Sequence, residues 1–246
     1  MNYSNIPEQL PKNVYHKTFF SALAGHDIGY NIYLPSSYET SAKNYAVQYH
    51  LHGWQGNESS EVEVMEKVYG SGDVITVFPN LSISDDPAFP FESMITDELI
   101  HHIDSEYRTI DSRDARSISG FSMGGGMAFI FAMKHTELFS KVTAYAGTFH
   151  HYFEHGMETV GADPKKAVCL HDYILSSVKR PEFNVLTLLN KYASSLRDNL
   201  EIEMRVGTDD VLYCDNEIVH YHLNLLQIPH KYLTFEGVSH LLRGIV

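Results

Sequence analysis

Cysteine is scarce in this sequence, which contains only Cys169 and Cys214 among 246 residues. Two thiols allow one disulfide, but a chain of this length can bury a sufficient core without a covalent staple. The spacing of the two residues matches no metal-binding or redox motif. We therefore expect buried or idle thiols rather than a cysteine-based metal or redox site.

Positive charge and long apolar runs are also in short supply. Lys and Arg number 18 against 31 Asp and Glu, which gives a formal net charge of −13. Such a surface repels phosphate backbones and anionic lipid headgroups, so we expect neither a nucleic acid nor a membrane partner. The apolar runs are strand-sized, well short of the roughly 20 residues of a membrane-spanning helix. Residues 1–17 lack a basic-then-apolar leader pattern, which predicts a cytoplasmic protein unless a leader precedes this sequence.

What the sequence does contain is a regular alternation of strand and helix patterns. Segments 14–20 and 28–34 are rich in β-branched and aromatic residues and predict an antiparallel pair. Further strands are predicted at 46–52, 73–78, 116–121, 141–146, 201–206 and 231–235, and helices at 94–107, 123–135, 185–196 and 216–227. This alternation predicts one α/β domain over residues 1–246, with a mostly parallel central sheet flanked by helices and antiparallel strands at its N-terminal side.

The sharpest motif is Gly120-Phe121-Ser122-Met123-Gly124, which joins a predicted strand to a predicted helix. A serine in such a sharp turn exposes its hydroxyl group, and the flanking glycines let neighbouring backbone approach closely. The free N–H groups of the following helix favour a developing negative charge. The alternative is a glycine-rich helix start with an incidental serine. The strand and helix on either side favour a nucleophile at Ser122.

A serine nucleophile needs a base, and the base needs an orienting acid. In the serine hydrolases built on this strand–turn–helix arrangement, the chain order is serine, acid, histidine. Asp210 follows the predicted strand 201–206, and His240 follows the predicted strand 231–235, so the order fits. Asp209 is the alternative acid, and a surface imidazole is the alternative interpretation of His240.

Negative charge on a tetrahedral intermediate needs backbone donors close to the nucleophile. One expected donor is the N–H group of Met123. The second is the N–H group of Trp54, in the glycine turn of His50-Leu51-His52-Gly53-Trp54 that ends the strand 46–52. Other histidine groups in the chain lack the spacing of a zinc motif such as H-E-x-x-H, so no metal or cofactor is expected.

Together these residues resemble the putative-esterase family, which includes S-formylglutathione hydrolases, feruloyl and acetyl-xylan esterases, enterochelin esterases and mycolyltransferases. The resemblance lies in segments 45–53, 73–80, 96–99 and 107–108, the Ser122 motif and the loops of Gly207 and His240. It implies the α/β-hydrolase fold, with Ser122 as nucleophile, His240 as base, Asp210 as acid, and Trp54 and Met123 as oxyanion donors.

Two parts of the sequence depart from that pattern. The sequence ends shortly after His240, where similar proteins continue into a closing helix. We expect the packing that covers the sheet edge either to be missing or to be supplied by a partner subunit in a homo-oligomer. Segment 148–183 occupies the place of substrate-selecting insertions and is rich in aromatic residues. We expect it either to form a lid, with Phe149, Tyr152 and Phe153 touching the substrate, or to pack as an ordinary long loop.

The resulting hypothesis is a serine carboxylic-ester hydrolase that acts through an acyl-enzyme on small acyl or aromatic esters of the acetyl or feruloyl type. Two alternatives use the same three residues: an acyltransferase, and a thioesterase of the S-formylglutathione hydrolase type. A non-catalytic binding protein on the same scaffold is a further alternative. Such a protein would be expected to lose one of the three residues, and this sequence contains all of them.

Overall fold

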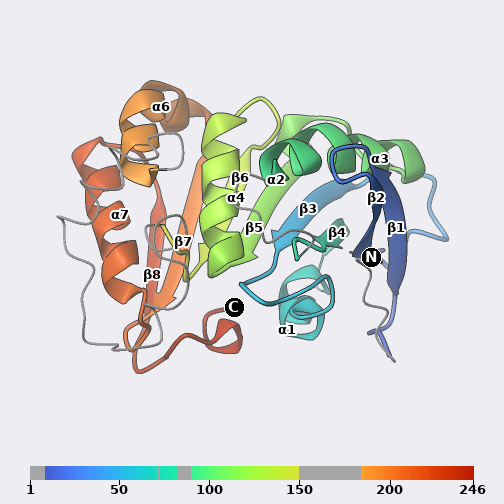
Figure 1. The fold of residues 1–246 in the computed structure, drawn as a ribbon, viewed down its shortest axis with the longest axis horizontal. Helices are drawn as coiled ribbons and strands as arrows, with labels where there is room; N and C mark the ends of the chain where they lie inside the picture. Colours follow the sequence, from blue (N-terminus) through green and yellow to red (C-terminus); the bar gives the residue numbers. More distant parts are fainter. Residues whose placement is uncertain (1–8, 71, 83–89, 150–183) are drawn as a thin grey trace.

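The computed structural model describes residues 9–70, 72–82, 90–149 and 184–246. Eight strands in these ranges form one sheet in the order β1-β2-β4-β3-β5-β6-β7-β8 (Figure 1). They are β1 (Val14–Ser21), β2 (His26–Tyr33), β3 (Ala46–Leu51), β4 (Val74–Pro79), β5 (Arg116–Phe121), β6 (Lys141–Tyr145), β7 (Glu201–Gly207) and β8 (Lys231–Phe235). Strands β1 and β2 pair antiparallel, as do β2 and β4, and the remaining neighbours are parallel.

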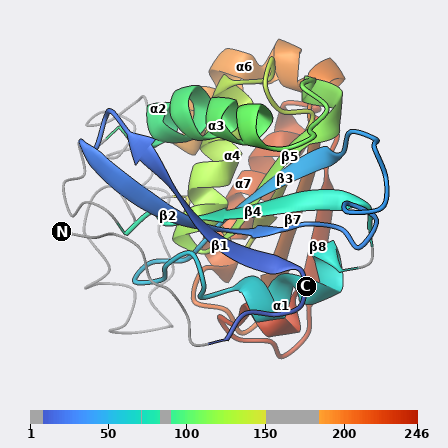
Figure 2. The same cartoon turned by 90° about the vertical axis from the view of Figure 1, so that its right-hand side faces the viewer.

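Helices cover both faces of this sheet (Figure 2). One face is covered by α1 (Val62–Tyr69) and the short C-terminal turn η5 (Leu242–Gly244), whose apolar residues form one cluster with strand side chains. The other face carries α2 (Phe91–Ser93), η1 (Met94–Leu99), α3 (Ile100–Glu106), α4 (Met123–Lys134), α6 (Val185–Asn199) and α7 (Tyr213–Leu225). Within the described ranges, no helix is both long and apolar enough to span a membrane.

The strand and helix pattern read from the sequence is confirmed. Every predicted strand is present, and the antiparallel pair lies at the N-terminal side as expected. The prediction for 94–107 differs in detail, because the helix begins at Phe91 and its middle turn, Met94–Leu99, is a π-helix. Helix α1 was missed. Helix α6 begins at Val185, directly after its N-cap Asn184, whose side chain accepts the Thr187 N–H group.

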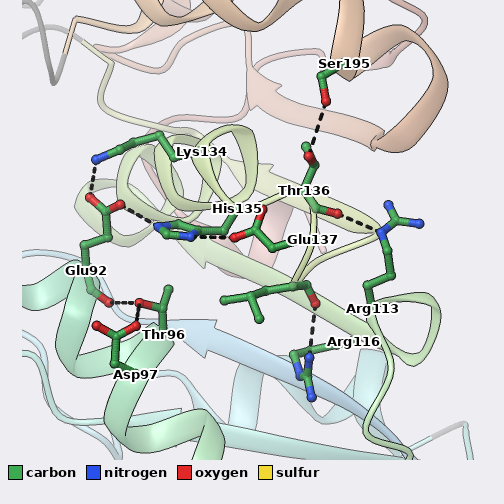
Figure 3. A network of polar contacts seen from close by, with 11 residues as sticks. Glu92, Thr96, Asp97, Arg113, Arg116, Lys134, His135, Thr136, Glu137 and Ser195 are labelled. Carbon is green, nitrogen blue, oxygen red and sulfur yellow. Dashed lines mark hydrogen bonds and ion pairs between the residues drawn. The ribbon is translucent and has the colours of Figure 1, made fainter.

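The C-terminal end of α4 is tied to α2 by a half-buried polar network (Figure 3). The Glu92 carboxylate pairs with Lys134 Nζ at 2.5 Å and with His135 Nε2 at 2.6 Å, and His135 Nδ1 lies 2.9 Å from Glu137 Oε1. The hydrogen bond to Glu92 is the main reason that the pKa of His135 is raised. Burial alone would raise the pKa of Glu92, but the bonds from His135 and Lys134 outweigh it and lower that pKa.

This network predicts a pH-dependent contribution to stability. Because the pKa of His135 is raised in the folded state, its contribution to stability is complete below the ordinary histidine pKa and is lost as pH rises through the folded-state value. Because the pKa of Glu92 is lowered, its contribution is complete above the ordinary glutamate pKa and is lost as pH falls through the folded-state value. The pair is therefore strongest between about pH 4.5 and 6.5. His135→Gln should lower Tm by about 2–4 °C near pH 5.5 and by clearly less at pH 9.

Thermal unfolding of wild type and variant at both pH values measures the effect. His101→Gln is the matched control, because the His101 ring bonds the backbone oxygen of Asp97. His101→Gln should change Tm, relative to wild type, by the same amount at both pH values. A His135→Gln difference that is equal at pH 5.5 and 9 would rule out the ion pair as its source.

Candidate active site

Ser122 lies in the sharp turn between β5 and α4, where the sequence motif placed it. Its backbone has φ 55° and ψ −117°, a left-handed region that a non-glycine residue rarely adopts. Main-chain bonds hold it there: the Ser122 N–H group donates to the Tyr145 oxygen, and the Ser122 oxygen accepts from Gly126 and Thr148. A strained residue that its surroundings hold in place is typical of functional sites.

Glycine at the first and last positions of the motif 120–124 is a steric requirement. A Cβ atom at Gly124 would lie 2.0 Å from the Leu51 oxygen at the end of β3. A Cβ atom at Gly120 would lie 2.3 Å from the Gly124 backbone. Any side chain at either position would force the turn away from β3, so this spacing of glycines around Ser122 follows from the packing of backbone on backbone.

A chain of hydrogen bonds connects Ser122, His240 and Asp210. Ser122 Oγ lies 2.9 Å from His240 Nε2, and His240 Nδ1 lies 2.9 Å from both carboxylate oxygens of Asp210. The Asp210 side chain is fully buried, whereas that of His240 is 28% exposed. With Nδ1–H donating to the carboxylate, Nε2 keeps its lone pair and can accept the proton of the serine hydroxyl group.

The structure distinguishes the two candidate acids, Asp209 and Asp210, by where their side chains lie. Asp209 is exposed, and its backbone N–H group donates to the Val238 oxygen in the loop that carries His240. Asp210 Oδ1 additionally accepts the Leu212 N–H group at 2.8 Å, which fixes the carboxylate in place. Of the two neighbours, the structure brings only Asp210 to the imidazole within the described residues.

The two expected oxyanion donors lie on either side of Ser122. Met123 is the first residue of α4, directly after the serine. On the other side, a Cβ atom built on Gly53 would lie 3.5 Å from Ser122 Cβ, which places the Gly53–Trp54 turn against the nucleophile. The Trp54 side chain is 46% exposed at the surface beside this turn. Both backbone N–H groups thus belong to segments that border the serine.

The structure accounts for part of the expected substrate-contacting set. Phe149 is 1% exposed, and its ring packs on Phe129 with centroids 5.2 Å apart. Its backbone N–H group donates to the buried carboxylate of Asp215 on α7. The side chain of Phe149 therefore lies in the core, as the packing alternative expects. Tyr152 and Phe153, like most of segment 148–183, lie outside the described residues.

Several histidines near the site make specific hydrogen bonds. His52 Nδ1 donates to the Gly53 oxygen at 2.7 Å, and its Nε2 accepts the Leu81 N–H group at 2.9 Å. Burial lowers the pKa of His52, which favours this neutral form. His50 contacts Glu61 and Ser119. Cys214 is a free, exposed thiol, and Cys169 falls outside the described ranges.

Sequence reasoning missed two residues beside the nucleophile. The Phe121 ring stacks on the His240 imidazole, with centroids 4.7 Å apart and planes 26° apart. The sequence signal that could have indicated Phe121 was its position inside the serine motif. Glu61 accepts the Gly53 N–H group and pairs with His50. Nothing in the spacing of Glu61 from the turn indicated that contact.

Comparison with known proteins gives a matching family model and several curated relatives. A family model described as Putative esterase matches residues 21–221. Esterase Rv1288 of Mycobacterium tuberculosis is 27% identical over 152 residues, which are 57% of this chain and 33% of that protein. An endo-1,4-beta-xylanase/feruloyl esterase of Xylanibacter ruminicola is 31% identical over 148 residues, 52% of this chain and 20% of that protein. The chain thus spans a third or less of these curated relatives.

Solved structures resemble nearly the whole chain. A ferulic acid esterase superimposes with a TM-score of 0.74 and 23% identity, covering 93% of this chain and 91% of that one. An S-formylglutathione hydrolase from Staphylococcus aureus gives a TM-score of 0.76 and 21% identity, with 93% and 92% covered. Together with the mixed eight-stranded sheet, these likenesses confirm the α/β-hydrolase fold expected from the sequence.

Proposed function

This chain belongs to the Putative esterase family, and on that premise we propose that it is a serine carboxylic-ester hydrolase that works through an acyl-enzyme. The observation that carries the proposal is the pair of 2.9 Å steps from Ser122 Oγ to His240 and from His240 to the buried Asp210. A nucleophile, a base and an orienting acid in hydrogen-bond reach are what acyl transfer requires.

In the proposed reaction, Ser122 Oγ forms a bond to the ester carbonyl carbon while His240 Nε2 takes the hydroxyl proton. Collapse of the tetrahedral intermediate breaks the bond to the alcohol oxygen, and His240 returns the proton to the departing alcohol. Water then adds to the acyl-enzyme, losing a proton to His240. The second tetrahedral intermediate then loses its bond to Ser122 Oγ, His240 returns the proton to that oxygen, and the acid is released. Asp210 holds the imidazole in the required tautomer and stabilises its charged form.

The negative charge on each intermediate would be stabilised by the backbone N–H groups of Met123 and Trp54. Met123 begins α4, so its N–H group has no partner within the helix and lies at the positive end of the helix dipole. Trp54 follows the turn packed against Ser122. Donors fixed before the reaction are worth more than mobile ones, because they need no reorganisation as the charge develops.

For the substrate we propose a small-molecule ester of an acetyl or feruloyl type. The support is the likeness to proteins named ferulic acid esterase and xylanase/feruloyl esterase. A second candidate is a thioester, favoured by the likeness to an S-formylglutathione hydrolase over more than nine-tenths of both chains. The same acyl-enzyme mechanism serves both, with an alcohol oxygen leaving in one case and a thiol sulfur in the other.

A substrate panel tests the proposal: p-nitrophenyl acetate, methyl ferulate, an acetylated sugar and S-formylglutathione. We expect turnover of at least one, and covalent labelling of Ser122 by a serine-directed phosphonate, located by mass spectrometry. Product analysis with an added alcohol separates hydrolysis from acyl transfer. No turnover with no labelling, or labelling at another serine, would contradict the proposed function.

A further inference from the structure

A carboxylate that the proposed reaction does not use lies beneath the turn beside Ser122. Glu61, just ahead of α1, is 9% exposed. Its Oε1 accepts the Gly53 N–H group at 2.8 Å, and its Oε2 lies 2.7 Å from His50 Nε2. Burying a carboxylate is unfavourable unless it is paired and hydrogen-bonded, and here both oxygens have partners.

The partner of Glu61 is joined to the strand that carries the nucleophile. His50, at 1% exposure, places Nδ1 2.8 Å from Ser119 Oγ on β5, three residues before Ser122. Ser119 Oγ also accepts Gln48 Nε2 on β3 at 2.8 Å. The Glu61 carboxylate is therefore fixed relative to β3 and β5 together, the two strands whose ends carry the Gly53 turn and the serine.

Hydrogen bonds to both the N–H group and the oxygen of Gly53 hold the Gly53–Trp54 peptide in place. Glu61 takes the Gly53 N–H group, while the Gly53 oxygen accepts His52 Nδ1 at 2.7 Å and the Gly56 N–H group at 3.0 Å. The Gly53 oxygen and the Trp54 N–H group belong to one trans peptide plane, so they point in opposite directions. Fixing the oxygen toward His52 and Gly56 therefore fixes the direction of the Trp54 N–H group.

We propose that Glu61 is a positioning residue that aims the Trp54 N–H group at the oxyanion, through its bond to Gly53 and its pair with His50. The inference rests on the proposed function, because it assigns a task to a residue that touches no substrate. Without the carboxylate, the Gly53 N–H group would be left buried and unpaired, and the turn would shift to find a partner for it. The Trp54 donor would move with the turn.

The test compares Glu61→Ala with Glu61→Gln. Losing a whole oxyanion donor costs about 10²- to 10³-fold in kcat, so a misdirected donor in Glu61→Ala should cost about 10- to 100-fold. KM for p-nitrophenyl acetate should change less than about threefold, because the defect lies in the transition state. Affinity for an aryl trifluoromethyl ketone, whose serine adduct carries the oxyanion, should fall in parallel with kcat.

Glu61→Gln should stay within about threefold of wild type, because its amide oxygen can accept the Gly53 N–H group and its NH₂ group can donate to His50 Nε2. Glu98→Ala is the matched control. Glu98 accepts the Leu23 N–H group in the β1–β2 turn, three strands away from β5 in the sheet. It should lower Tm but leave kcat and ketone affinity within about twofold, as a merely structural carboxylate would.

Wild-type kcat and ketone affinity in Glu61→Ala would overturn the proposal, as would equal losses in Glu61→Gln and Glu61→Ala. If Glu61→Ala does not fold, Glu61→Asp replaces it: its carboxylate is retracted by one methylene, and about a tenfold loss in kcat is expected. Failure of the inference is distinct from failure of the proposed function. Hydrolysis that survives in Ser122→Ala removes the function itself, whereas an inactive Ser122→Ala beside a fully active Glu61→Ala removes only the role of Glu61.

Discussion

Ser122→Ala is expected to lower ester hydrolysis by about 10⁴- to 10⁶-fold while the protein remains folded. The hydroxyl group is the only atom removed, and its partner, His240 Nε2, belongs to a side chain that is still in reach of water. The backbone at Ser122 is already held by the Tyr145, Gly126 and Thr148 bonds, none of which uses the side chain. Tm should therefore change by no more than about 2 °C.

The measurement is the steady-state rate of the best substrate in the panel, with unfolding followed by circular dichroism. Ser117→Ala, on the same strand β5 but away from the turn, is the matched control and should retain the wild-type rate. Activity that survives in Ser122→Ala but is lost in Ser117→Ala would place the nucleophile elsewhere.

Asp210→Asn is expected to lower the rate of ester hydrolysis by about 10³- to 10⁴-fold, and Asp209→Asn by less than about twofold. An asparagine amide can present its NH₂ group to His240 Nδ1, which then becomes the acceptor and leaves Nε2 protonated. In that tautomer the imidazole cannot take the Ser122 proton. Asp209 is exposed and bonds the Val238 oxygen through its backbone, so its side chain does not set the tautomer.

Paired kinetics of the two asparagine variants decide the matter, because the residues are neighbours with the same chemistry. The Ser122 phosphonate reaction should slow in Asp210→Asn in the same proportion as hydrolysis, since both need the neutral base. A larger loss in Asp209→Asn would show that the carboxylate in contact with His240 in solution is the other one.

Much of the fold was predictable because its information is local. Strand-sized β-branched runs alternate with helical spacing along the chain, and this pattern alone predicts a mostly parallel sheet. Helix α1 was equally readable: Val62, Met65 and Tyr69 recur at helical spacing, and all three are buried against the sheet. The π-helix turn at Met94–Leu99 was not, because its extra residue leaves no mark on the apolar spacing.

The residues of the candidate site also divide into those that the sequence predicts and those that it does not. The serine motif is predictable because close backbone contacts require its two glycines. Gly120 lies against Gly124, and Gly124 lies against the end of β3. Asp210 and His240 could be proposed from their order after strands, but the choice between Asp209 and Asp210 needed the direction of each side chain. Glu61 could not be found from sequence, because its bond to Gly53 depends on how a glycine turn folds back over the start of α1. For Phe149 the sequence left a substrate contact and core packing as alternatives, and the structure buries this residue in the core.

The bonds that flank segment 150–183 bear on how such an enzyme can change. Thr148 donates to the Ser122 oxygen, Phe149 donates to Asp215, and Asn184 restarts the chain as the cap of α6. These attachments fix the two ends independently of the sequence between them. Residues 149 and 184 are therefore natural splice points: recombination between relatives can exchange the intervening segment while the nucleophile turn keeps its shape, provided that Asp215 and Asn184 are retained.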